Sequence, residues 1–144
     1  MARIKIVSPE KIVTSITIPV RITDINYGNH VGNDSFVSII HEARVLWLKQ
    51  NNFSELDVAG SALIMSGLAI EFKSESFYGD ILTIDIIGGE ISKIGFELFY
   101  KITTQRNSST ILVANAQTDM VCFDYKNKKL MPVPDALKNI LSKR

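Results

Sequence analysis

Apolar and polar residues alternate near the start of the chain, and this pattern predicts a β-strand with one buried face. The apolar positions are Ile16, Ile18, Val20 and Ile22. A period of two places these side chains on the same side of a strand. Proline cannot donate a ladder hydrogen bond, so Pro19 predicts an edge strand or a bulge at this point.

The spacing changes between Asp34 and Gln50, where it predicts a long amphipathic helix. At about 100° per residue, one broad side of this helix is apolar. That side carries Phe36, Ile39, Ile40, Ala43, Leu46 and Trp47, and the opposite side carries Ser38, His41, Glu42 and Lys49. Asn33, Asp34 or Ser35 can cap the helix, because each has a side-chain oxygen that accepts from free N–H groups.

Four further strands and one short helix are predicted after a loop at 51–61. The strands are expected at Leu63–Lys73, Ile81–Gly88, Lys93–Thr104 and Thr110–Asp124, with turns at 78–80, 88–89 and 106–109. The helix is expected at about Pro134–Ser142, docked loosely. One long helix cannot cover both faces of such a sheet. We therefore expect an α+β fold in one domain spanning residues 1–144, with a curved antiparallel sheet of about five strands wrapped around the central helix.

Open sheet edges favour pairing between copies of the chain, so a homodimer joined edge to edge is expected. Such a contact would place the polar segment that precedes the long helix beside strands of the partner. Two sites per dimer would follow from the symmetry.

Composition excludes several classes of partner. The 16 Lys and Arg residues against 15 Asp and Glu give a net charge of +1, so no long-range field selects nucleic acid. No signal peptide and no run of about 18 apolar residues is evident, so we expect a cytoplasmic protein that does not span a membrane. The single cysteine, Cys122, lies in an apolar run and is interpreted as a buried hydrophobe.

The most polar segment, 24–34, separates the first strand from the long helix and is the best candidate for a reactive site. It reads Asp-Ile-Asn-Tyr-Gly-Asn-His-Val-Gly-Asn-Asp. A helix start offers unpaired N–H groups and the positive end of the helix dipole. Together with an amide, an imidazole and a carboxylate, these groups suit an anionic intermediate.

This order of features resembles the hotdog-fold thioesterase superfamily, in the branch named after 4-hydroxybenzoyl-CoA thioesterase. The resemblance covers roughly Val13 to Asp124. It is carried by Arg21–His30 with the following Val31-Gly32-Asn33, by Glu42-Ala43-Arg44, and by Phe72–Asp80 with its closing Tyr-Gly-Asp. It implies a hotdog fold, assembly as a homodimer or a dimer of dimers, and hydrolysis of acyl thioesters of coenzyme A or acyl carrier protein.

One departure from the family pattern bears on the mechanism. Much of this branch has two acids separated by one residue in the loop, and the second acid acts as nucleophile or general base. Asp24 matches the first acid, but Asn26 stands at the second position, and a neutral amide can do neither job. Asn26 together with His30 is similar to the arrangement in plant acyl-carrier-protein thioesterases, although the acid of that arrangement is missing.

The general base could therefore be His30, Asp24, Glu42 or Glu71, or it could be absent. His30 is the main candidate, because imidazole readily exchanges a proton near neutral pH. The competing interpretation is a histidine that only holds the loop together. Asn26 could orient the attacking water or bind the thioester carbonyl, or it could be a turn residue that bonds to its own backbone.

Asp24 is interpreted mainly as a residue that fixes the loop through backbone N–H groups, although it could also orient the ring of His30. The backbone N–H groups of Gly32 and Asn33 are the predicted donors to the oxyanion, and family analogy points to Asn33. Glu42 and Glu71 are reserve candidates, and His41 is interpreted as a surface residue.

The apolar residues Leu63, Met65 and Leu68 could line an acyl tunnel, although packing in the core is the favoured interpretation.

The sequence thus predicts an acyl-CoA thioesterase in which Asn26 holds a water molecule and His30 deprotonates it. Neither a metal nor a bound cofactor is expected, since coenzyme A enters as part of the substrate. Two alternatives stay open: a hotdog protein that binds acyl thioesters without turnover, and a hotdog dehydratase.

Overall fold

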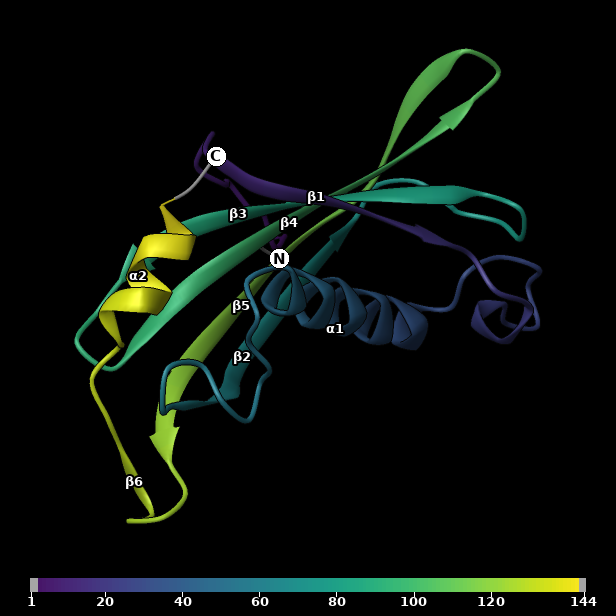
Figure 1. Cartoon of the computed structure of the whole chain (residues 1–144). Coiled ribbons are helices and arrows are strands. Elements are labelled where there is room, and N and C mark those ends of the chain that lie inside the picture. Colours follow the sequence, from purple (N-terminus) through teal and green to yellow (C-terminus); the bar gives the residue numbers. More distant parts are fainter. Residues whose placement is uncertain (1–2, 143–144) are drawn as a thin grey trace.

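The computed structural model describes residues 3–142 and contains one antiparallel sheet with two α-helices (Figure 1). The strands are β1 (Ile12–Pro19), β2 (Ala62–Phe72), β3 (Ile81–Ile91), β4 (Gly95–Arg106), β5 (Ser109–Asp124) and β6 (Lys129–Leu130). The helices are α1 (Asn33–Gln50) and α2 (Asp135–Leu141), and a 3₁₀ turn spans Ile22–Asp24. The order in the sheet is β1-β3-β4-β5-β2, and β6 pairs with the end of β5.

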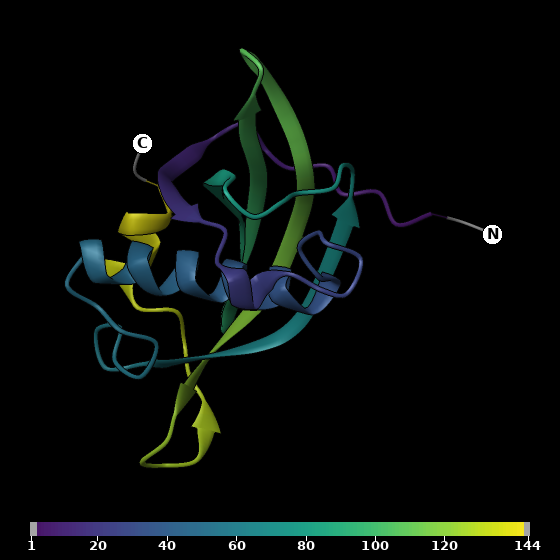
Figure 2. The same cartoon turned by 90° about the vertical axis from the view of Figure 1, so that its right-hand side faces the viewer.

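The sheet curves around α1, as the two views in Figures 1 and 2 show. The helix buries Phe36, Ile39, Ile40, Ala43, Arg44, Trp47 and Leu48. The facing side of the central strands buries alternate residues, such as Leu98 and Ile102 of β4. This arrangement confirms the predicted α+β fold, in which a long central helix fills the concave side of an antiparallel sheet.

The first strand lies earlier in the chain than its alternation predicted. β1 ends at Pro19, and the chain then turns through the 3₁₀ segment, where the side chain of Ile22 is 67% exposed. β1 is an edge strand, as Pro19 had indicated, because proline removes a donor that an inner strand needs.

The predicted turn at Gly88 and Gly89 is wrong, because β3 continues through both residues to Ile91. A Cβ on Gly88 would lie 2.6 Å from the carbonyl oxygen of Leu141, and a Cβ on Gly89 would lie 2.7 Å from atoms of Glu97 and Phe99. The glycines are therefore there for close packing, the other common reason for glycine inside a strand.

The C-terminal helix docks firmly, in contrast to the loose docking expected from its small apolar side. Leu137, Ile140 and Leu141 are buried, and α2 contacts β3 at Gly88. The two-residue strand β6 was not predicted. Cys122, in β5, is fully buried as expected, and burial raises the pKa of its thiol.

The two edges of the sheet differ in length and in the residues beside them. β1 has eight residues and β2 has eleven. Large apolar side chains are exposed along β2 and the adjoining face of α1: Met65, Leu68, Phe72, Val37 and Val45. Within residues 3–142, none of the helices combines the length and the apolar character that crossing a bilayer demands.

Candidate active site

The polar segment folds into a small hairpin that delivers the chain to the start of α1. Ile25 and Val31 form an antiparallel bridge, and the N–H of Asn26 donates to the carbonyl oxygen of His30 at 2.8 Å. Asn29 closes the turn in the left-handed region, at φ 66°. The N–H of Val31 donates to the carbonyl oxygen of Ser76 at 2.8 Å, which ties the hairpin to the segment after β2.

Asp24 stabilises this hairpin through bonds to Arg21 and Gly32, and it makes no hydrogen bond to His30. Its buried carboxylate accepts from the backbone N–H of Arg21 at 2.8 Å and pairs with the Arg21 guanidinium at 3.2 Å. Its carbonyl oxygen accepts from the N–H of Gly32 at 3.0 Å. The structural interpretation of Asp24 therefore fits these contacts, and the proposed orientation of the His30 ring does not.

The start of α1 has no side-chain cap, contrary to the prediction that Asn33, Asp34 or Ser35 would supply one. Gly32 is the N-cap residue, and the N–H of Ser35 donates to its carbonyl oxygen. No group among residues 3–142 accepts from the backbone N–H of Asn33 or Asp34. Two donors at the positive end of an 18-residue helix are thus free for a ligand.

The hypothesis that Gly32 donates to the oxyanion needs correction. Its N–H already binds the carbonyl oxygen of Asp24, because the chain folds back across the 3₁₀ turn before the helix begins. The free pair of N–H groups belongs instead to Asn33, as expected, and to Asp34.

The contacts of His30 define its neutral tautomer. Nδ1 lies 3.1 Å from the carbonyl oxygen of Val31. A carbonyl oxygen only accepts, so Nδ1 carries the proton and Nε2 keeps its lone pair. The ring is half-buried and lines a cavity, so Nε2 is available as a proton acceptor.

Asn26 lies between His30 and the helix start. Its Oδ1 accepts from the N–H of Gly28 at 2.8 Å, and this bond leaves Nδ2 as a donor. A Cβ on Gly28 would lie 3.2 Å from this Oδ1 and 3.3 Å from Nε2 of His30. A Cβ on Gly32 would lie 3.9 Å from Nδ2. The amide therefore shares the surroundings of Gly28 with the imidazole, and its nitrogen lies near Gly32 at the helix start.

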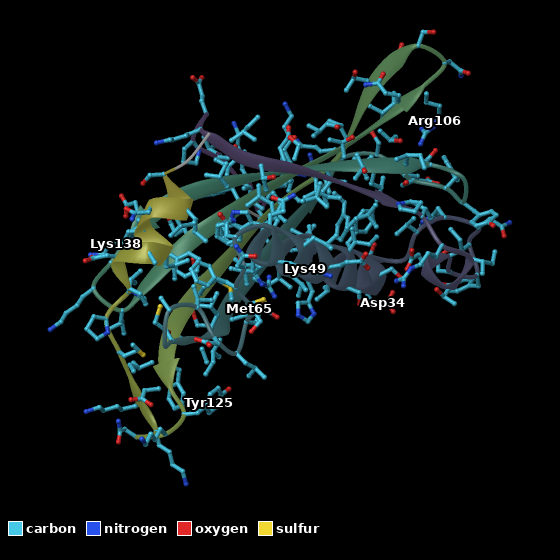
Figure 3. All side chains as sticks on the ribbon, viewed as in Figure 1. Asp34, Lys49, Met65, Arg106, Tyr125 and Lys138 are labelled. Carbon is cyan, nitrogen blue, oxygen red and sulfur yellow. The ribbon has the colours of Figure 1, made fainter. Side chains whose placement is uncertain are left out.

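Asp34 is a polar group at this point that the sequence indicated only as a cap. Its Oδ1 would lie 2.7 Å from a Cβ on Gly32, beside the amide of Asn26. Figure 3 shows Asp34 at the end of α1 that adjoins the hairpin. Its spacing of eight residues from Asn26 concealed this proximity.

A cavity of about 230 Å³ opens beside these groups. Its lining joins the hairpin and α1 to the end of β2: His30, Val31, Asn33, Phe36, Phe72 and residues 73–76. Phe36 and Phe72 pack edge to face, with ring centroids 5.5 Å apart, and form its apolar wall. The cavity thus combines a polar end, where the free N–H of Asn33 lies, with an apolar side.

The segment after β2 is held by a charged cluster around Asp80. The carboxylate of Asp80 accepts from the N–H of Phe77, the hydroxyl of Ser76 and the guanidinium of Arg106, the last at 2.7 Å. Burial alone would raise the pKa of Asp80, but these donors outweigh it and lower the pKa. Arg106, at the hairpin labelled in Figure 3, also lies over the ring of Phe77. This cluster positions one wall of the cavity.

The two reserve carboxylates lie outside the cavity lining. Glu71 is paired with Lys73 at 3.1 Å and accepts from the N–H of Ile6 at 3.3 Å. These bonds lower the pKa of Glu71, so its carboxylate is a weaker base. Glu42 is exposed on α1, where its charge acts on Arg21.

A second polar cluster crosses the core from α1 to the sheet. Glu55 accepts from His41 Nε2 at 2.6 Å and from Arg44 Nε at 2.7 Å. Arg44 Nη1 donates to the hydroxyl of Tyr100, which bonds to the hydroxyl of Thr118. Partial burial would raise the pKa of Glu55, but bonds to Arg44 and His41 lower it. His41 is exposed, as predicted, yet it belongs to this cluster.

No group of three or more His, Cys, Asp or Glu side chains in the described part of the chain is placed to hold a metal ion. The chemistry available at the hairpin is that of an imidazole, an amide, a carboxylate and two backbone donors. Such a set can polarise a carbonyl group and accept a proton from water.

Comparison with known protein families gives one match over most of the chain. The thioesterase-like superfamily matches residues 20–141. The 1,4-dihydroxy-2-naphthoyl-CoA hydrolase of Microcystis aeruginosa is 33% identical over 108 residues, which cover 73% of this chain and 75% of that protein.

Solved structures agree on the fold. The 1,4-dihydroxy-2-naphthoyl-CoA thioesterase of Synechocystis superposes with a TM-score of 0.77 at 25% identity, covering 88% of this chain and 93% of that one. A 4-hydroxybenzoyl-CoA thioesterase, crystallised with 4-hydroxybenzoyl-CoA, gives a TM-score of 0.78 at 16% identity, with coverage of 90% and 98%. At that identity the second similarity concerns the fold alone.

Proposed function

The chain belongs to the thioesterase-like superfamily, and we propose on this basis that it hydrolyses acyl thioesters of coenzyme A to a free acid and a thiol. The observation that carries the proposal is the uncapped start of α1, where Asn33, a residue with a free N–H, lines the same cavity as His30. The names of the relatives support coenzyme A as the carrier of the acyl group.

Attack of water on the thioester carbonyl moves negative charge onto its oxygen. The N–H groups of Asn33 and Asp34 stabilise that charge, and Nδ2 of Asn26 adds a third donor nearby. Nε2 of His30 accepts the proton from the attacking water, so a C–O bond forms while the imidazole becomes charged. The C–S bond then breaks, and the proton passes from His30 to the departing thiolate.

In this mechanism Asn26 acts as a donor, because its oxygen is already bonded to Gly28. Asn26 therefore stands where the family has the loop acid, but a neutral amide cannot act as a base. His30 takes the role of the base. The route uses only water and protein groups, so it needs no metal and no bound cofactor. We place the enzyme in the cytoplasm, where a single buried cysteine stays reduced.

Release of free thiol from a panel of aryl, short-chain and long-chain acyl-CoA substrates tests the activity. We expect turnover with at least one class of substrate. Tight binding of acyl-CoA without thiol release would instead identify a binding protein. A change in enoyl absorbance without thiol release would identify a dehydratase.

The open edge of β2 and the apolar side chains beside it support a homodimer formed by pairing β2 with its copy. Sedimentation equilibrium is expected to give at least twice the chain mass of 16.1 kDa, and it distinguishes a dimer from a dimer of dimers. Leu68→Asp places a charge at this edge and is expected to reduce the mass to that of one chain. A wild-type protein that sediments as a single chain would refute the pairing.

A further inference from the structure

A second cavity lies on the same side of α1 as the candidate site, one to two turns further along the helix. Its volume is also about 230 Å³. It is lined by Val37, Ser38, Ile40, His41 and Arg44 of α1 and by Met65 and Leu68 of β2. The walls are mostly apolar, and the polar residues among them are Ser38, His41 and Arg44.

The two cavities follow each other along the line between α1 and β2, and the term groove denotes both of them together. The first joins residues 30–36 to residues 72–76, and the second joins residues 37–44 to residues 65–68. The helix and the strand therefore run in opposite directions along the groove. Figure 3 labels Asp34, at the start of α1, and Met65, which lines the second cavity.

Arg44 presents a free donor to the second cavity. Its side chain is 6% exposed, Nε donates to Glu55 and Nη1 donates to Tyr100. Nη2 has no partner among residues 3–142, although no buried side-chain nitrogen or oxygen in that range lacks one. Nη2 is therefore not sealed in the core, and it opens to the cavity that Arg44 lines. An arginine donor in an apolar pocket favours an oxygen acceptor on the ligand.

The length of the groove sets the size of the ligand. Eight residues separate Asn33 from His41, which corresponds to about 12 Å along the helix. Each bond is ~1.5 Å long, and the zigzag of an extended chain shortens its reach per bond. A chain of about ten atoms therefore covers this distance. A group attached to a carbonyl carbon at Asn33 can therefore reach Arg44.

We propose that the acyl group of the substrate lies in this groove and ends in an oxygen that accepts a hydrogen bond from Nη2 of Arg44. This inference rests on the proposed thioesterase function, and it specifies the substrate class: an apolar acyl group of about ten atoms with a polar far end. A chain that ends in a methyl group would remove water from the free donor and offer it no hydrogen-bond acceptor.

The test compares kcat/KM for four substrates that differ only in the acyl group: hexanoyl-CoA, decanoyl-CoA, ω-hydroxydecanoyl-CoA and ω-carboxynonanoyl-CoA. We expect at least one of the two oxygen-terminated chains to exceed decanoyl-CoA by about tenfold, the effect typical of one hydrogen bond to a charged group. The hydroxyl and carboxylate arms show which oxygen is preferred. Equal values for the three long chains would overturn the inference.

Two variants locate the effect in the second cavity. Arg44→Gln is expected to abolish the preference for a polar end, but its burial can cost stability. Met65→Trp fills the cavity from a position that is 40% exposed, so folding should be retained, and sedimentation should give the wild-type mass because Met65 also lies beside the edge proposed to pair. It is expected to lower kcat/KM about tenfold for the long polar chains and to leave hexanoyl-CoA unchanged. Val45→Trp is the matched control, since Val45 is 39% exposed on α1 but does not line the cavity.

A uniform loss over all substrates in Met65→Trp, or the same split in Val45→Trp, would overturn the assignment of the cavity. Failure of the proposed function looks different. In that case wild-type protein releases no thiol from any of the four substrates or from the aryl-CoA and short-chain panel.

Discussion

Replacing Asn33 by proline is expected to lower kcat by roughly 10²- to 10³-fold, with the helix intact, because it deletes one of the two free donors at the start of α1. Proline is well suited to the first position of a helix, where its missing N–H has no intrahelical partner. The preceding residue, Gly32, has φ −70° and ψ 152°, the extended conformation that a residue before proline adopts. The substitution thus removes a hydrogen-bond donor at little conformational cost.

Asn33→Ala is the matched control, because it removes the side chain and keeps the N–H. Thiol release should stay within a few-fold of wild type in this variant. Circular dichroism and thermal unfolding should show that both variants retain the fold. An Asn33→Pro enzyme with the wild-type kcat would show that the oxyanion is bound elsewhere.

Replacing His30 by alanine is expected to lower kcat by about 10²- to 10⁴-fold, the usual contribution of a general base. The reason is geometric: Nδ1 donates to the carbonyl oxygen of Val31, which leaves Nε2 as the ring nitrogen that can accept a proton. A residue that only holds the loop would change thermal stability instead, and His30→Gln would restore such a role.

Asp34→Asn and His41→Ala separate the other candidates. Asp34 is the nearest alternative base, and its substitution keeps the backbone N–H and the size of the side chain. His41 controls for the general loss of an imidazole when hexanoyl-CoA is the substrate, since it bonds to Glu55 and lines the second cavity, which that short chain is not expected to reach. A full rate in His30→Ala, together with a large loss in Asp34→Asn, would transfer the role of base to Asp34.

Much of the fold was predictable from periodicity alone. The broad apolar side of α1 and the alternation in β4 require a helix enclosed by a sheet, and both are seen. The errors occur where packing outweighs local preference. Gly88 and Gly89 look like a turn in sequence, but they lie inside β3 because α2 and the side chains of β4 leave no space for a Cβ.

The site was predictable in its location and less so in its details. The segment 24–34 was recognised by its polarity, and Asn33 retains the donor expected of it. Whether each polar group is already bonded depends on partners that are distant in the sequence, and periodicity does not reveal those partners. Examples are the carbonyl oxygen of Ser76 that accepts from Val31 and the Lys73 ammonium that pairs with Glu71. Arg44 was noted only as part of a motif, although its donor faces a cavity.

The unequal edges of the sheet also set a limit on growth. If the longer edge, β2, pairs with a copy of itself, the outer strands of the merged sheet are the two β1 strands, apart from the two-residue β6 at the end of β5. Each β1 strand ends at Pro19 and has an irregular register near Ile12 and Thr14. Proline and irregular register are features by which natural sheets discourage further strands. The assembly is therefore expected to be self-terminating through its sheets, which protects an exposed apolar strand from fibre formation.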